Sequence, residues 1–430
     1  MRLDLYNLAI KKIIAELNRF TGLWISELNL THNCLGKENF TDLVVLFSMI
    51  KPFEVACLNL HCNGFGQKSG SELLALFRIL KHSGITRLGL SANDLSLKTG
   101  AELAALLTVL SDSDIHELDL SYNWLGKRPD AELIELFKIW RSTPIIALDL
   151  ACNALGEKAG SVLASMFYAL KGSAMTHLGL SHNDLYQLSA ADFSALLFAI
   201  KEAQITHLDL SENRLHLMDA AFETLFDALK DSSVTHLNLW ANGIGHLSVL
   251  TAQFSLLQGT AVTHLDLGEN DLKWVPAEEL AALFRVFKET KLRHIGLNYS
   301  YFQERTAEEL HLVFNALPAN IATVKLSLQE LMEMGKEQRQ AIQTRFPRAD
   351  QVILVNHIEG RELNPSFRPD DANVYRRLGF KVSPPSLTGL TSFFVVSNNF
   401  RFKHRTQKML PEEVIQCLVG NRPNPMMFQT

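Results

Sequence analysis

Apolar and polar residues alternate in a short frame that recurs through most of the chain. In residues 118–125 the frame reads Leu-Asp-Leu-Ser-Tyr-Asn-Trp-Leu, and every copy carries an asparagine at the same place. These asparagines are Asn33, Asn63, Asn93, Asn123, Asn153, Asn183, Asn213, Asn242 and Asn270. The first seven are 30 residues apart, and the last two follow after 29 and 28. Because side chains alternate along a strand, Leu118 and Leu120 share one face and Asp119 takes the other. Each copy therefore predicts a short strand with a buried leucine face.

A second pattern with helical spacing fills the interval between successive frames. Apolar residues recur at positions i, i+3, i+4 and i+7, as in Leu73, Leu76, Phe77 and Leu80. Each repeat thus supplies one strand and one helix, which predicts a parallel sheet backed by helices. Helices are about 10 Å wide and strands about 4.8 Å apart, so the stack must curve with the sheet inside. The predicted fold class is an α/β solenoid, an open horseshoe.

The recurring asparagine follows the strand where the chain turns away. A buried asparagine side chain can pair with the amides and carbonyls that such a turn removes from water. We therefore expect a ladder of stacked asparagines.

The Leu-x-Leu-x-x-Asn-x-Leu frame with helical linkers resembles the ribonuclease-inhibitor-like class of leucine-rich repeats, over roughly residues 25 to 330. Phrases such as Thr-His-Leu-Asp-Leu-Ser at 206–211 are similar to leucine-rich-repeat effectors that Legionella-type bacteria inject into host cells. The resemblance implies a protein-interaction module and export by a specialised secretion system. It also implies a secretion tail, for which Glu412, Glu413 and Phe428 are the candidates.

The pattern divides the chain into four parts. Residues 1–24 form an N-terminal cap with a helix near 5–19, and residues 25–330 hold the repeats. Residues 331–360 are a degenerate repeat or C-terminal cap, with a last strand expected at 352–355. Residues 361–430 are a C-terminal segment with ten Lys plus Arg and five Asp plus Glu, net +5, against −10 for residues 1–360. Ser300 and Gln329 stand where the asparagine is expected, which indicates that the array ends there.

Composition narrows the cellular setting. A net charge of −5 gives no general reason to expect nucleic acid or an anionic membrane as partner. The first twenty residues are amphipathic and predict no Sec signal, and no apolar run is long enough to span a membrane. The five cysteines form no Cys-x-x-Cys pair, which favours a reducing compartment. We expect a monomer without cofactor or metal, secreted into the host cell or otherwise cytoplasmic.

Function is sought on the open face of the sheet, beside the two leucines of each strand. Carboxylates outnumber cations there, and Arg87 is the single Arg or Lys, so a host protein with a basic patch is the expected partner. Trp240 lies between repeats that carry Ser211 and Gly268, and is expected to stand exposed as an anchor. The predicted partner-binding residues are Trp240, His177, His207, His236, His264, His294, Asp119, Asp149, Asp209, Asp266, Tyr122 and Trp124.

The row of five histidines leaves alternatives open. Duplication of a Thr-His-Leu phrase explains it without any role, and a flat row does not make the tetrahedral cage that zinc requires. A pH-responsive surface is the other alternative, because imidazoles beside Asp209 and Asp266 would turn this half positive in mild acid.

The sequence contains no recognisable catalytic motif, and we expect that the protein is not an enzyme. The sequence contains no Gly-rich phosphate loop, His-Glu-x-x-His helix or Gly-x-Ser-x-Gly elbow. A GTPase-activating protein is the alternative function, with Arg214 as its candidate arginine. Cys417 lacks the Cys-x-Asp motif of effector ubiquitin ligases. Residues 400–405 mix aromatics with cations, but their alternation is simpler to explain as a strand than as a nucleic-acid or lipid site.

Overall fold

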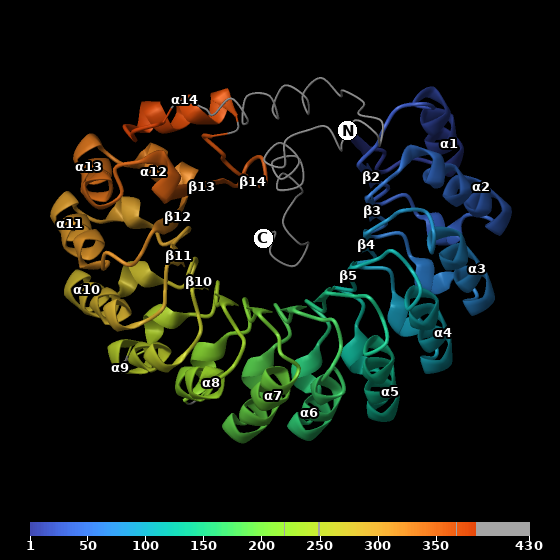
Figure 1. Ribbon diagram of the computed structural model, residues 1–430, viewed down its shortest axis with the longest axis horizontal. Helices are drawn as coiled ribbons and strands as arrows, with labels where there is room; N and C mark the ends of the chain where they lie inside the picture. Colours follow the sequence, from blue (N-terminus) through green and yellow to red (C-terminus); the bar gives the residue numbers. More distant parts are fainter. Residues whose placement is uncertain (219, 248–249, 367, 384–430) are drawn as a thin grey trace. The chain divides into compact units, whose positions relative to one another are not determined.

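The computed structural model describes residues 1–218, 220–247, 250–366 and 368–383. The chain forms two compact units. Unit 1 ends at Asp209, and unit 2 begins at Leu210. Within each unit the strands line the inner side of an arc and the helices its outer side (Figure 1).

Unit 1 is built from strand–helix repeats whose strands are parallel and lie in the order of the chain. Its strands are β1 (Arg2–Asp4), β2 (Glu27–Asn29), β3 (Cys57–Asn59), β4 (Arg87–Gly89), β5 (Glu117–Asp119), β6 (Ala147–Asp149), β7 (His177–Gly179) and β8 (His207–Asp209). Its helices are α1 (Ile10–Arg19), α2 (Phe40–Ile50), α3 (Gly70–Leu80), α4 (Gly100–Leu110), α5 (Asp130–Trp140), α6 (Gly160–Tyr168) and α7 (Ala190–Glu202). The frame leucines pair in register, as Leu118 does with Leu148.

Unit 2 is built from the same strand–helix repeats, but its last strand is antiparallel to the others. Its strands are β9 (His236–Asn238), β10 (His264–Asp266), β11 (His294–Gly296), β12 (Thr323–Ser327), β13 (Val352–Asn356) and β14 (Arg361–Glu362). Its helices are α8 (Ala221–Leu229), α9 (Leu250–Ser255), α10 (Ala277–Val286), α11 (Ala307–Ala316), α12 (Leu328–Glu333), α13 (Lys336–Arg345) and α14 (Pro369–Leu378). Strands β9 to β13 are parallel and β14 is antiparallel to β13. The predicted α/β leucine-rich-repeat solenoid is confirmed within each unit.

Several helices begin at good capping residues. Ser69, Thr99 and Thr306 each accept a hydrogen bond from the backbone N–H three residues on, while the glutamate there pairs with the cap backbone. This reciprocal box satisfies amides that a helix start leaves unpaired. The apolar face of each helix then packs on the leucines of the sheet, which are almost fully buried.

The asparagine ladder is confirmed. Oδ1 of Asn153 accepts the N–H of Asn123 at 3.2 Å and of Leu125 at 3.0 Å, both in the preceding repeat. Its Nδ2 donates to the carbonyls of Leu120 and Leu150, at 3.0 and 2.9 Å. Each rung therefore joins two repeats, and the ladder ends at Ser300, whose buried hydroxyl has no hydrogen-bond partner.

The ends of the array differ in detail from the expectation. Helix α1 begins at Ile10. It is preceded by strand β1, in which Leu3 is in register with Leu28 of β2. At the other end the Tyr375 hydroxyl donates to the carbonyl of Val352 at 2.7 Å and accepts the N–H of Leu354 at 3.0 Å. Helix α14 therefore packs directly on the last long strand.

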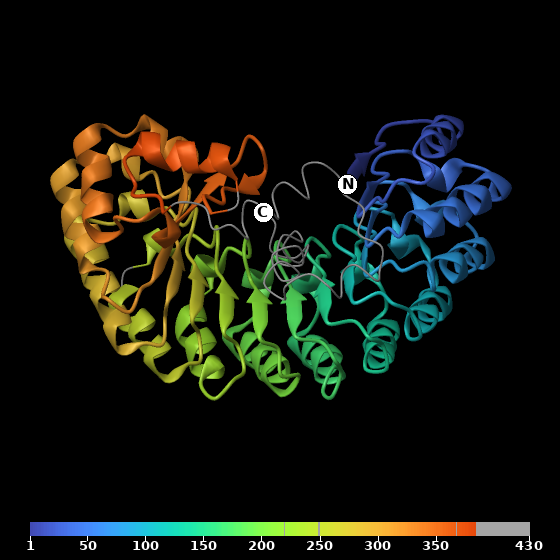
Figure 2. The same ribbon diagram turned by 45° about the horizontal axis from the view of Figure 1, so that its top comes forward.

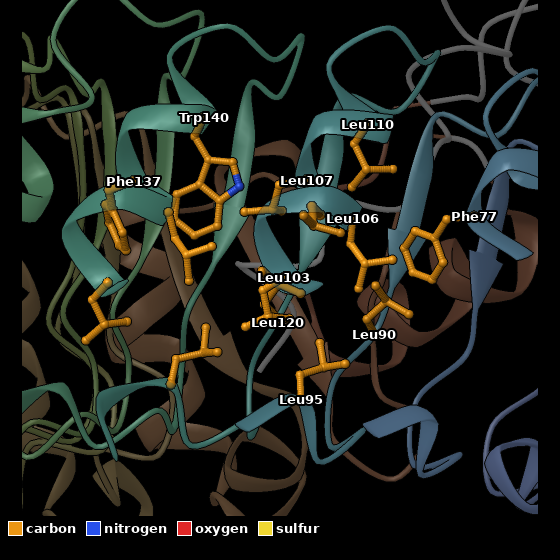
Figure 3. A pocket seen from close by; sticks show the side chains of 14 residues that line it. Phe77, Leu90, Leu95, Leu103, Leu106, Leu107, Leu110, Leu120, Phe137 and Trp140 are labelled. Atoms are coloured by element: carbon orange, nitrogen blue, oxygen red, sulfur yellow. The ribbon is translucent and has the colours of Figure 1, made fainter. Parts of the chain in front are cut away.

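One place in the core of unit 1 is incompletely filled. Leu107 stands where the repeats before and after carry Phe77 and Phe137, and a cavity of about 40 Å³ remains among these helices (Figure 3). Trp140 lines it, and its buried indole N–H has no hydrogen-bond partner.

Candidate protein-binding face

The inner face of each sheet carries the polar positions of the frame. In β5 and the two residues after it, Glu117, Asp119 and Ser121 face inward, while Leu118 and Leu120 are buried against the helices. Register between strands aligns these positions into three columns. Figure 2 shows the strands of both units with the helices behind them.

Aspartates of the middle column have a local structural role. Oδ1 of Asp119 accepts the N–H of Ser121 at 2.8 Å, and Oδ1 of Asp149 accepts that of Ala151 at 2.8 Å. Asp266 does the same for Gly268 at 2.9 Å. Asparagines in this column make the equivalent bond; they are Asn29, Asn59 and Asn238. The aspartates therefore hold the turn after the strand, a role that the sequence did not reveal.

Glycines in the same column let a side chain reach across a strand. Asp266 occupies the space above Gly296 and its Oδ2 meets Lys325 Nζ on β12 at 3.5 Å. His61 likewise lies above Gly89 and meets Asp119 on β5 at 3.0 Å.

Lys325 is a functional candidate that sequence reasoning missed. It lies in the middle column of β12, beyond the last strand at which the columns were followed, and it also pairs with Glu362 at 3.4 Å. Burial lowers the pKa of Lys325, but the carboxylates of Asp266 and Glu362 outweigh burial and raise it. The acidic character expected from Asp266 is therefore largely compensated within unit 2.

Asp149, unlike Asp266, lies near other carboxyls. Its carboxyl lies above Gly179, 2.7 Å from where a side chain there would begin, in the direction of Asp209 on β8. Burial, and then repulsion from Asp119 and Asp209, raise the pKa of Asp149 to about 8. The middle column of unit 1 thus crowds carboxyls together, and Asp149 keeps its proton at neutral pH.

The histidines stack face to face. In unit 1 the rings of His177 and His207 are 3.8 Å apart, and in unit 2 His264 lies 3.8 Å from His236 and 3.9 Å from His294. Burial and the neighbouring imidazoles lower the pKa of His264 to about 4.

The pKa values of His236 and His294 are lowered as well, chiefly by burial. These shifts all oppose the charging of the row in unit 2 by mild acid, most strongly at His264, and the pH-responsive surface stays a prediction. The sequence showed the row but not the stacking that makes a second positive charge costly.

Trp240 does not stand exposed as expected. It is half-buried, because Gly268 has no side chain and the edge of the indole occupies the space that a side chain would fill. Its ring contacts that of Tyr299 edge-on at 6.5 Å, and Tyr299 in turn stacks on His357 at 3.9 Å.

Tyr122 and Trp124 are among the exposed aromatics of unit 1, at 57% and 55%. Both have left-handed backbones, with φ of 55° and 57°, on either side of the ladder residue Asn123. They lie on the rim loop and not on the sheet itself. Arg214 occupies the same left-handed loop position as Trp124 and is also exposed.

The structure groups the predicted residues by unit. Unit 1 holds Asp119, Asp149, Asp209, His177 and His207 on its sheet, with Tyr122 and Trp124 at the rim; unit 2 holds Asp266, His236, His264, His294 and Trp240.

The described residues hold neither a metal-ion cluster nor a membrane-spanning helix. Among them, no group of three or more His, Cys, Asp or Glu side chains can hold a metal ion. No helix in this part of the chain is long and apolar enough to cross a membrane. Residues 400–405, Cys417, Glu412, Glu413 and Phe428 lie outside the described residues.

Comparisons with known proteins agree with the fold. No family model matches the chain, and no curated protein matches it. Among solved structures it is similar to the leucine-rich repeat-containing protein LegL7 from Legionella pneumophila, with 26% sequence identity and a TM-score of 0.57. The match covers 79% of this chain and 96% of that protein.

Proposed function

Because the chain is a leucine-rich-repeat protein, we propose that it is a protein-interaction module whose inner sheet face binds a basic segment of another protein. The repeats supply a rigid surface on which side chains from many parallel strands face one way. Proteins of this architecture commonly use such a surface for binding, whereas their helices serve to bury the leucines.

The observation that carries the proposal is the charge of the inner face in unit 1. Its first two columns hold the guanidinium groups of Arg2 and Arg87 against the carboxyls of Asp4, Glu27, Glu117, Asp119, Asp149 and Asp209. Burial is the largest cause of the raised pKa of Asp149, and repulsion from the neighbouring carboxyls of Asp119 and Asp209 adds to it, since a like-charged neighbour disfavours the ionised form. A Lys or Arg from a partner would relieve that repulsion.

Delivery into a host cell is the finer part of the proposal. The similarity to a Legionella pneumophila leucine-rich-repeat protein supports an effector role, with a host protein as the target. Binding without catalysis is the form we favour. Nothing in the geometry of Arg214 supports a GTPase activator, because the same loop position holds side chains as different as Trp124 and Ala154.

Affinity capture from host-cell lysate with the intact chain tests the proposal. A captured protein should carry a basic segment, and a synthetic peptide of that segment should displace it, with weaker binding at higher salt. A partner that the basic peptide does not displace, or whose binding strengthens with salt, would contradict the proposal.

A further inference from the structure

Each stacked histidine follows or faces a threonine whose hydroxyl contacts the ring. Thr263 Oγ1 lies 2.9 Å from Nδ1 of His264 and 3.2 Å from the carbonyl oxygen of Thr235 on the preceding strand. The unit 1 stack repeats this arrangement, with Thr206 Oγ1 at 2.9 Å from His207 Nδ1 and 3.1 Å from the Thr176 carbonyl.

These two contacts determine where the imidazole proton lies. A threonine hydroxyl has one proton, and a carbonyl oxygen can only accept, so the hydroxyl donates to the carbonyl. Its oxygen then accepts from Nδ1–H of the histidine. The opposite assignment would place two oxygen lone pairs against each other at about 3.1 to 3.2 Å with no proton between them.

The neutral ring therefore presents its other nitrogen, Nε2, as a bare acceptor. In His294 the same nitrogen, Nδ1, contacts a threonine hydroxyl, that of Thr323 at 2.6 Å. His264 and His294 are stacked 3.9 Å apart on neighbouring strands, so the two rings lie face to face along the sheet. The half-burial of both rings keeps them neutral.

We propose that the stacked pair His264 and His294 of unit 2 forms a row of hydrogen-bond acceptors that binds arginine guanidinium groups of the partner. A guanidinium has five N–H donors in a planar fork and no acceptor, so it can reach two adjacent rings. A lysine ammonium is a compact, strongly hydrated point charge that matches a row of neutral acceptors less well. The inference rests on the proposed function, since it requires that the inner face meets the partner.

Nitrogen-15 NMR of the intact chain tests the tautomer without any partner. Neutral His264 and His294 should show a protonated Nδ1 and a bare Nε2. Thr263→Val, which keeps the side-chain shape and removes the hydroxyl, should let His264 populate both tautomers. A bare Nδ1 in the unaltered chain would overturn the proposal.

Titration with a synthetic tetra-arginine peptide tests the binding. The Nε2 resonance of His264 should move while Nδ1 changes little. His264→Phe, which keeps a stacked ring and removes the acceptor, should weaken binding about tenfold, the effect expected of one hydrogen bond to a charged donor.

A second variant separates this inference from the proposed function. Asp149→Asn removes the carboxyl of unit 1 that a bound cation would ionise, but keeps a side-chain oxygen that can hold the turn. If Asp149→Asn weakens peptide binding and His264→Phe does not, the acidic face stands and the histidine row is overturned. If neither variant changes binding, or the peptide does not bind, both are overturned.

Discussion

At the scale of single residues, position in a column did not by itself reveal what a side chain does. The sequence placed Asp119, Asp149 and Asp266 on the inner face correctly, but their bonds to the turn after the strand were not visible in it. The residue that donates differs each time, being Ser121, Ala151 or Gly268, so no motif marks the contact. Side chains that cross above a glycine were equally hidden, because the contact joins strands two repeats apart.

Asp149 makes the proposed binding depend on pH. A cation bound beside it favours the ionised carboxylate, so binding should release a proton from a group whose pKa is about 8 in the free protein. Affinity for the basic partner should therefore rise from pH 6 to pH 8 and level off above. Calorimetry in buffers of different ionisation enthalpy at pH 7 measures the proton directly. In Asp149→Asn the dependence should be absent, and an affinity that falls over this range would refute the assignment.

At the scale of elements, the periods of the sequence predicted the strands and helices of the repeats, and the structure confirms them. Strand β1 was missed because its Arg-Leu-Asp-Leu frame is not followed by a ladder asparagine. Strand β14 and helix α14 were missed because they belong to no repeat, and their place depends on contacts such as that of Tyr375 with Val352.

The ladder should be the most sensitive element to a single substitution. Asn153→Ala leaves two buried amides and the carbonyls of Leu120 and Leu150 without their partner, because no water replaces a fully buried side chain. We expect a loss of at least about 3 kcal/mol in the free energy of unfolding, measured by urea denaturation. Asn18→Ala, on the exposed side of α1, is the control and should change little. If both variants lost the same free energy of unfolding, the ladder would contribute no more to stability than an exposed asparagine does.

The cavity beside α4 offers a change in the opposite direction. Leu107→Phe restores the ring found at Phe77 and Phe137 and should stabilise unit 1 by about 1 kcal/mol, as cavity-filling substitutions commonly do. Thermal unfolding measures the effect. Leu97→Phe, at a position 63% exposed, provides the matched control without a cavity. Destabilisation by Leu107→Phe alone would show that the neighbouring leucines already fill this space.

At the scale of the whole molecule, the sequence predicted the architecture more fully than the site. The same frame recurs in every repeat, so the solenoid of each unit follows from the period alone. The residues at the inner positions vary within that frame. The contacts that each side chain makes depend on the residues of the neighbouring strands. Lys325 shows the difference, since it neutralises Asp266 from a strand where the frame has already decayed.

The most direct test of the central claim, that the inner sheet face binds the partner, is a matched pair of arginine substitutions. Ala151 lies partly exposed on the inner face beside Asp149, whereas Ser165 is exposed on the outer helix α6. With the captured partner, the dissociation constants of Ala151→Arg and Ser165→Arg are compared with that of the unaltered chain. Ala151→Arg, which adds bulk and positive charge, should weaken binding about a hundredfold or more, a cost of about 3 kcal/mol, and Ser165→Arg should not. Unchanged binding in Ala151→Arg, or loss in Ser165→Arg instead, would contradict the account.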